Sequence, residues 1–288
     1  MSQPAAHGLL AIDVGSSRVK FGWFPAAVAC TSDIKPSQLP IAAPKLPEPE
    51  HSLAVSHQTT SPEQFSQQLH DWLDESGIHQ PSILLGSVHA EAAAKVQSAL
   101  SEKSFPPPRQ LFAADLPITI QVEHPQKVGI DRLLNAIAVN CLRKIDSPAI
   151  VVDLGTANTV DLITAQGAFA GGAILPGIAM SARVLHESTS TLPYLPPSTF
   201  ESAAESPPEV VGKSTHPAIA SGLYWGAVGA VNEIIARMSQ DLSQPPQLFI
   251  TGGDARLVAP NIQNNQGPAR HVPHLVLAGI QLAAEELL

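Results

Sequence analysis

The stretch Leu9-Leu10-Ala11-Ile12-Asp13-Val14-Gly15-Ser16-Ser17 has a near-copy much later in the chain, Ile150-Val151-Val152-Asp153-Leu154-Gly155-Thr156-Ala157. Each begins as a short apolar run, which is typical of a buried strand, and ends in an aspartate followed by glycine and a hydroxyl residue. A second strand pattern follows each copy, at residues 19–23 and 160–163. Both stretches therefore predict a β-hairpin with a tight turn.

The turn of each hairpin has the residue types that suit phosphate binding. Glycine lets the backbone approach a phosphate closely, and the amides and hydroxyls of the turn can bind its oxygens. The aspartate can hold a hydrated cation beside the phosphate. One such hairpin could be an ordinary turn in which the aspartate bonds its own backbone. Two in one chain indicate two related domains that hold one nucleotide.

Composition narrows the classes of protein. The chain has 288 residues, of which 44% are hydrophobic, and this suffices for one large or two medium domains. A net charge of -9 argues against general nucleic-acid binding. We see no signal-peptide pattern and no apolar run long enough for a membrane span, so we expect a cytoplasmic protein without a membrane partner. Cys30 and Cys141 are expected to be buried thiols, and the histidines to be surface or loop residues that bind no zinc.

Strand and helix patterns alternate in both halves of the chain, which predicts an α/β fold. The boundary between the halves is placed at residues 145 and 146, ahead of the second hairpin. The expected helices cover residues 61–73, 90–100, 130–141, 222–237 and 279–288, and further strands are expected at 82–88 and 248–250.

Further motifs follow in order. They are Gly129-Ile130-Asp131-Arg132, Gly171-Gly172-Ala173-Ile174-Leu175-Pro176-Gly177, Gly212-Lys213-Ser214-Thr215 and Thr251-Gly252-Gly253. Together with the hairpins, this ordered set resembles type III pantothenate kinases, which belong to the actin-like superfamily of ATPases and sugar kinases. The resemblance covers nearly the whole chain, and its specificity lies in the set, because each motif alone is weak.

The resemblance implies duplicated ribonuclease-H-like (actin-like) domains with a nucleotide cleft between them. Residues 1–145 would carry the first phosphate motif and the Gly-x-Asp-Arg substrate motif. Residues 146–288 would carry the second phosphate motif, the dimer contacts and the adenosine loop.

The implied activity is ATP-dependent phosphorylation of pantothenate to 4'-phosphopantothenate, the first step of coenzyme A biosynthesis. The implied partners are ATP and pantothenate in a homodimer, and the implied cofactors are Mg²⁺ with ATP and a monovalent cation, K⁺ or NH₄⁺. Two alternatives stay open: an actin-like kinase for another small anionic alcohol, and a catalytically weak, nucleotide-binding regulatory protein.

Asp131 is the expected general base, because the start of a helix favours its carboxylate form and a carboxylate can take the proton of the attacking hydroxyl. Arg132 can pair with the carboxylate of pantothenate. The family pattern assigns the other positions. ATP contacts are expected from Asp13, Val14, Gly15, Ser16, Ser17, Arg18, Val19, Lys20, Thr156, Thr251, Gly252 and Gly253. Substrate contacts are expected from Gly129, Ile130, Asp131, Arg132 and Thr215. Asp153 is expected to hold the monovalent cation, and Asp13 is expected to be associated with magnesium.

Two positions depart from the family pattern. Ser16-Ser17 replaces Asn-Thr in the first turn, so the chain loses an amide donor and a residue that tolerates left-handed backbone. Val122 stands where the family often has a tyrosine that lines the substrate pocket. The first departure predicts weaker ATP binding or a shifted loop, and both keep the regulatory alternative open.

Overall fold

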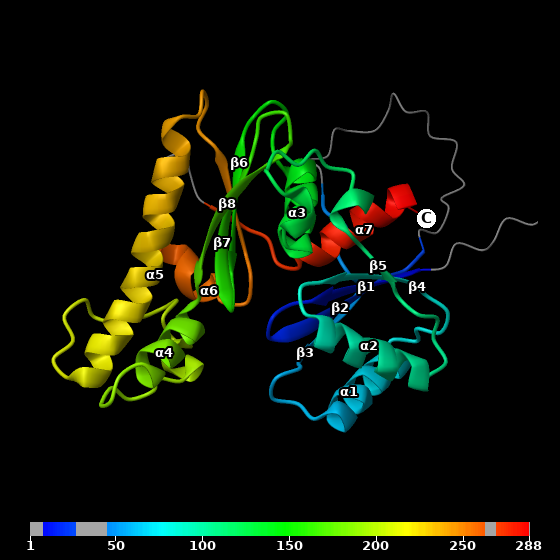
Figure 1. Cartoon of the computed structure of the whole chain (residues 1–288), viewed down its shortest axis with the longest axis horizontal. Coiled ribbons are helices and arrows are strands. Elements are labelled where there is room, and N and C mark those ends of the chain that lie inside the picture. Colours follow the sequence, from blue (N-terminus) through cyan, green and yellow to red (C-terminus); the bar gives the residue numbers. More distant parts are fainter. Residues whose placement is uncertain (1–7, 27–44, 263–268, 288) are drawn as a thin grey trace, which may run out of the picture. The chain divides into compact units, whose positions relative to one another are not determined.

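The computed structural model describes residues 8–26, 45–262 and 269–287, and it divides into two compact units. Unit 1 contains the chain up to Ile118, then His124–Leu142 and the C-terminal segment from Leu275. Unit 2 contains Thr119–Glu123 and Arg143–His274. Each unit has one five-stranded mixed sheet with helices packed against it (Figure 1).

The sheet of unit 1 has the strand order β3-β2-β1-β4-β5. Its central strand β1 is antiparallel to β2 and parallel to β4, β3 continues the antiparallel side, and β5 the parallel side. The strands are β1 Leu9–Val14, β2 Arg18–Phe24, β3 His51–Ser56, β4 Ser82–Ser87 and β5 Arg109–Gln110.

The sheet of unit 2 repeats this plan. Read from β8, its order is β8-β7-β6-β9-β10, with antiparallel pairs on the β7 and β8 side and parallel pairs on the β9 and β10 side. The strands are β6 Ala149–Leu154, β7 Ala157–Ile163, β8 Phe169–Pro176, β9 Gln247–Thr251 and β10 Arg270–His271. The predicted α/β class and the duplicated ribonuclease-H-like plan are confirmed. The predicted nucleotide cleft stays a prediction.

Helices α1 (Pro62–Glu75) and α2 (Ala90–Glu102) pack on one face of the sheet of unit 1. Ser61 starts α1 with a capping box, in which its hydroxyl accepts from the Gln64 amide and its own amide donates to the Gln64 side chain. The buried residues of α1 recur at helical spacing. They are Phe65, Leu69 and Leu73.

Helices α3 (Ile130–Leu142) and α7 (Leu275–Leu287) pack against each other, and both contact β4. Gly279 permits the close approach, because a Cβ atom at this position would lie 2.2 Å from the carbonyl oxygen of Leu134. By its contacts, the C-terminal helix α7 therefore belongs to unit 1, together with the N-terminal sheet. The two compact units are not the contiguous stretches 1–145 and 146–288, although the chain changes units at Leu142 and Arg143, close to the predicted boundary.

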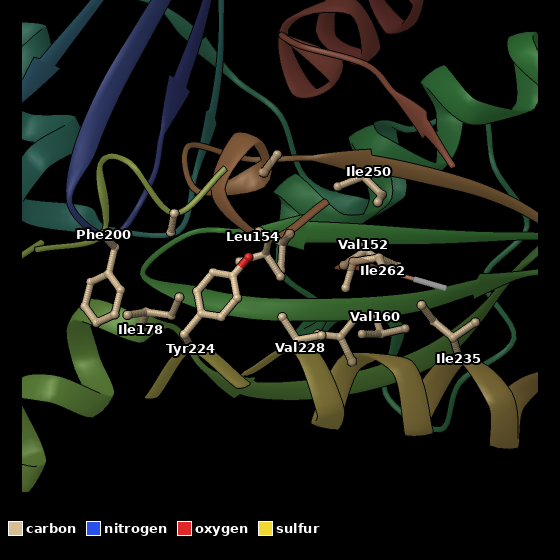
Figure 2. Packing of buried hydrophobic residues seen from close by; sticks show 14 of the residues in the cluster. Val152, Leu154, Val160, Ile178, Phe200, Tyr224, Val228, Ile235, Ile250 and Ile262 are labelled. Carbon is tan, nitrogen blue, oxygen red and sulfur yellow. The ribbon is translucent and has the colours of Figure 1, made fainter. Parts of the chain in front are cut away.

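The core of unit 2 lies between its sheet and helix α5 (Thr215–Gln240). Figure 2 shows Val228 and Ile235 of α5 close to Val160 of the sheet, with Tyr224 beside Leu154. The Tyr224 hydroxyl donates to the carbonyl of Leu257 at 2.9 Å and accepts from Asn261 at 2.8 Å. The remaining helices are α4 Ile178–Glu187 and α6 Ala255–Val258, with short 3-10 turns at Ala113–Asp115, Pro125–Lys127, Pro197–Phe200 and Ala259–Asn261.

Helix α5 corrects two expectations. It begins at Thr215, seven residues before the predicted start at Gly222, and by length and composition it meets the criterion for a membrane span, contrary to the sequence prediction. In the most apolar 18-residue stretch of α5, 39% is buried inside the structure. A core helix of a globular protein meets the same criterion of length and composition. The apolar segment 218–225 contributes Ile219, Ala220 and Tyr224 to the core of unit 2.

One smaller expectation was also wrong. Cys141 is exposed on α3 rather than buried. His57 lies in the turn after β3, as a loop residue, and is buried at 6% exposure. Cys30 lies outside the described residues.

Candidate functional site

The first phosphate-type turn connects the central strand β1 to β2. Asp13 is buried near the end of β1 and faces Lys20 of β2 in the strand register. The Lys20 ammonium lies 3.5 Å from the Asp13 carboxylate, so this predicted cation-associated carboxylate has a protein cation beside it. The amide of Gly15 donates to the carbonyl of Arg18 at 3.0 Å and closes the turn.

Two residues that sequence reasoning missed hold this turn from outside the motif. The Nε2 atom of His57 lies 3.0 Å from the carbonyl oxygen of Gly15, and the side-chain amide of Gln58 donates to the carbonyl of Ser16 at 3.0 Å. Both contacts join residues 42 positions apart in the sequence. No local pattern signals such a contact, since it depends on the pairing of β2 with β3.

The Gly-x-Asp-Arg motif forms the start of α3 in unit 1. Asp131 lies in the first turn of the helix, and its Oδ1 accepts from the Arg132 amide at 2.8 Å. A Cβ atom on Gly129 would lie 2.6 Å from this same oxygen, so the glycine provides the space for the carboxylate. Buried Ile130 anchors the turn, while Asp131 and Arg132 are half-buried. A carboxylate at a helix N-terminus is stabilised in its charged form, as a base requires.

The second phosphate-type turn connects β6 to β7 in unit 2. Asp153 precedes it, half-buried, and faces the uncharged Thr159 in the strand register. Asn158 is 2% exposed, and its side-chain oxygen accepts from the Gly155 amide at 3.1 Å. No role of its own was expected for Asn158, because its contact reaches back across the hairpin from β7 to Gly155.

The predicted adenosine loop meets this second turn directly. Strand β9 runs parallel to β6, which places Thr251 beside Asp153, and the Asp254 amide donates to the carbonyl of Leu154 at 2.9 Å. Gly252 has φ +101°, and a Cβ atom there would lie 2.1 Å from the Leu154 carbonyl oxygen. Residues nearly one hundred positions apart are thus brought into one corner of unit 2.

Thr215, predicted to contact substrate, lies at the start of α5 and lines a groove of about 640 Å³. Its polar lining comes from the helix start, where the backbone amides carry partial positive charge, together with Lys213. Its apolar lining comes from Leu185, Leu192, Ile219 and Leu223. This groove can accept a small molecule that has an anionic end and an aliphatic body.

The predicted site residues therefore form four clusters. In unit 1 they lie at the Asp13–Lys20 hairpin and at the start of α3, and in unit 2 at the β6–β7 corner and in the Thr215 groove. Val122 belongs to unit 2, where it packs near Gly171 of β8 and its neighbour Gln121 donates to the Phe169 carbonyl at 2.8 Å.

Comparison with known proteins decides the family. The family model described as type III pantothenate kinase matches residues 9–237. The chain belongs to the type III pantothenate kinase family. It is 40% identical over 173 residues to a type III pantothenate kinase of Acidiphilium cryptum, covering 59% of each chain. It is 40% identical over 145 residues to that of Rhodospirillum rubrum, covering 50% of this chain and 53% of the relative.

The alignments thus span between about half and three fifths of the curated relatives from the type III pantothenate kinase family. Among solved structures, a Baf family protein from Campylobacter jejuni superimposes with a TM-score of 0.56 at 19% identity, covering 96% of this chain and 98% of that one. An activator of 2-hydroxyisocaproyl-CoA dehydratase from Clostridium difficile gives a TM-score of 0.52 at 12% identity, covering 97% of each. At these identities the likeness shows the fold alone.

Proposed function

We propose that this protein transfers the terminal phosphoryl group of ATP to the primary hydroxyl of pantothenate. The observation that carries the proposal is the equivalent position of the two phosphate-type turns. Each follows the central strand of a sheet with the same strand order, and each has its aspartate near the end of that strand. Phosphoryl transfer needs positioning and charge stabilisation more than covalent chemistry, and each such turn offers backbone amides that can bind a phosphate. Family membership selects pantothenate as the acceptor.

Asp131 acts as the general base in this proposal. Its carboxylate accepts from the Arg132 amide in the first turn of α3. The neighbouring Arg132 guanidinium can bind the carboxylate of pantothenate through two hydrogen bonds. Acceptor deprotonation and acceptor binding are thus assigned to adjacent residues.

Two cations fit the carboxylates at the turns. Nucleotide-bound Mg²⁺ is typically held by one or two carboxylates plus the phosphates, and Asp13 supplies one. Lys20, 3.5 Å away, adds positive charge on the same side. For the monovalent cation, K⁺ or NH₄⁺, the oxygens of Asp153 and the adjacent β9 loop are the donors. Both ions would offset the negative charge of the phosphates when bound.

The Thr215 groove supports an acceptor site shared between two subunits. Exposed apolar side chains occur on α4 and in the segments near α5, as expected of a surface that another chain covers. They are Val184, Tyr194, Val210 and Val211. A two-fold homodimer is the commonest closed assembly, and we propose it as the working unit, in the cytoplasm where this step of metabolism takes place.

A turnover assay tests the proposal. Purified protein, MgATP and pantothenate should yield phosphopantothenate in potassium buffer, and much less when a bulky organic cation replaces potassium. Asp131→Asn keeps the oxygen that accepts from the Arg132 amide but removes the base, so we expect kcat to fall by about 10²–10⁴-fold with nucleotide binding retained. Asp115→Asn is the matched control, because Asp115 also accepts a backbone amide in unit 1, that of Phe112 at 2.8 Å.

Near-normal turnover by folded Asp131→Asn protein would remove the base assignment. Turnover of another small hydroxy acid, but not of pantothenate, would favour the alternative kinase. ATP binding without transfer to any acceptor would favour the regulatory alternative.

A further inference from the structure

We propose that His57 and Gln58 are positioning residues that clamp the first phosphate loop, Gly15–Ser17, in its nucleotide-binding conformation. The two residues directly follow β3, and the family pattern assigns neither of them. The inference rests on the proposed function, because it takes Gly15–Ser17 as the loop that binds nucleotide phosphate. It concerns unit 1 alone.

Three consecutive backbone carbonyls of the loop accept hydrogen bonds from this segment. His57 Nε2 donates to the Gly15 carbonyl at 3.0 Å, the Gln58 side-chain amide donates to the Ser16 carbonyl at 3.0 Å, and the His57 amide donates to the Ser17 carbonyl at 3.3 Å. A carbonyl oxygen can only accept, so Nε2 of His57 carries a proton. One short segment therefore determines the direction of every carbonyl in the turn.

Because the peptide bond is planar, fixing the carbonyls of the loop also fixes the direction of its amides. The described peptide bonds are trans, and in a planar trans peptide the N–H points away from the carbonyl of the same unit. With the carbonyls of Gly15 and Ser16 directed toward β3, the amides of Ser16 and Ser17 point to the opposite side. Preorganised amides that point to one side form the concave anion-binding arrangement typical of phosphate sites. The clamp thus supplies rigidity on the side away from the ligand.

The clamp itself is held by regular structure. Strand β3 pairs with β2 up to Ser56 opposite Arg18, directly before His57. The His57 ring contacts the His89 ring at a centroid distance of 4.7 Å, and His89 is fixed as the N-cap of α2 by accepting from the Ala92 amide at 3.2 Å. Lys95 of α2 donates to the His57 carbonyl at 3.4 Å. With His57 only 6% exposed, its ring has little freedom to leave the Gly15 carbonyl.

Ser16 and Ser17 stabilise a tight turn through their own side chains only weakly, because serine hydroxyls bond neighbouring backbone less strongly than Asn or Asp side chains do. Here His57 and Gln58 supply side-chain donors to the turn from the segment that follows β3. The turn is thus supported by a long-range clamp.

The test compares His57→Leu, which removes the donor, with His57→Gln, whose side-chain amide can still donate to Gly15. Losing one hydrogen bond of this kind should raise the KM for ATP and the Kd for MgATP by about tenfold. The KM for pantothenate should stay unchanged, and His57→Gln should recover most of the loss.

His70→Leu is the matched control. His70 makes the same kind of bond in unit 1, from Nε2 to the Ala99 carbonyl at 2.7 Å, but between α1 and α2. A general loss of stability would affect both leucine variants alike, whereas the clamp predicts a change in nucleotide affinity for His57→Leu only. If His57→Leu does not fold, Gln58→Leu removes an exposed contact to the same loop and should also weaken MgATP binding.

Equal KM values for ATP in wild type, His57→Leu and His70→Leu would overturn the clamp, as would unchanged MgATP affinity in Gln58→Leu. Binding of MgATP by calorimetry separates this inference from the proposed function. If the wild-type protein binds MgATP, and His57→Leu weakens that binding, but pantothenate is not phosphorylated, the clamp is supported and the kinase assignment is contradicted. A wild-type protein that binds no MgATP contradicts both.

Discussion

At the residue scale, the corner where the β9 loop meets the β6–β7 turn depends on the backbone conformation of a single residue, Gly252. Gly252 combines φ +101° with a space in which a Cβ atom would meet Leu154 backbone atoms at 2.1 and 2.5 Å and the Asp153 carboxylate at 2.6 Å. Side-chain-bearing residues rarely adopt this backbone conformation. The adjacent Gly253 has open space around its hypothetical Cβ atom. The two neighbouring glycines thus have unequal structural roles.

We predict that Gly252→Ala lowers the free energy of unfolding by about 1–3 kcal/mol or more, through backbone strain and displacement of the Leu154 segment. Gly253→Ala, the matched control, should change stability by less than about 0.5 kcal/mol. Chemical denaturation of both variants measures the difference. Equal stability of the two variants would show that the corner relaxes freely around position 252.

At the scale of the element, helix α3 carries different chemical groups at its two ends. Its first turn carries Asp131 and Arg132, and its last turns carry the exposed thiol of Cys141. Although the residue is exposed as a whole, neighbouring atoms partly desolvate its sulfur, and this desolvation raises the pKa of the Cys141 thiol. The negative charge of Glu285 on α7 raises it further. The packing of α3 on α7 therefore makes an accessible cysteine less acidic than a free one.

A raised pKa means that less thiolate is present at any given pH below that pKa, and the thiolate is the nucleophile. We predict that Cys141 reacts with iodoacetamide more slowly than a cysteine in an unstructured peptide, with the midpoint of its pH–rate profile shifted to higher pH. Glu285→Gln should move that midpoint back toward lower pH. Mass spectrometry of the Cys141 peptide gives the rate separately from Cys30. A profile identical to that of the free peptide would contradict the predicted shift.

At the scale of the whole molecule, the proposed acceptor site depends on a second copy of the chain. Thr215 lines its groove in unit 2, together with its neighbours Ser214 and Lys213. If Thr215 completes the neighbouring subunit's acceptor site, lesions in two different subunits can complement each other. The dimer then becomes a functional requirement that activity measurements can detect.

We predict that Thr215→Ala and Asp131→Asn proteins, each poorly active alone, regain part of the wild-type activity when they are dissociated and remixed. In a mixed dimer one site would carry both lesions and the other neither. Mass spectrometry of the intact dimers should confirm subunit exchange. Exchange without recovery of activity, or full activity of a wild-type monomer at assay concentration, would contradict the shared site.

Local patterns in the sequence determined the two hairpins, the helix starts after Ser61 and Gly129, and the α/β class. These features depend on alternation, turn residues and capping, which act within a few residues. The extent of α5 and the exposure of Cys141 were predicted wrongly, because apolar composition does not tell which side of a helix the rest of the chain covers.

Only the tertiary structure decided which distant residues meet. It placed Thr251 beside Asp153, brought α7 back to the sheet of unit 1, and set His57 and Gln58 against the Gly15–Ser17 turn. Each contact joins segments whose sequences say nothing about one another. Their proximity follows from strand pairing and core packing, which the chain satisfies only as a whole.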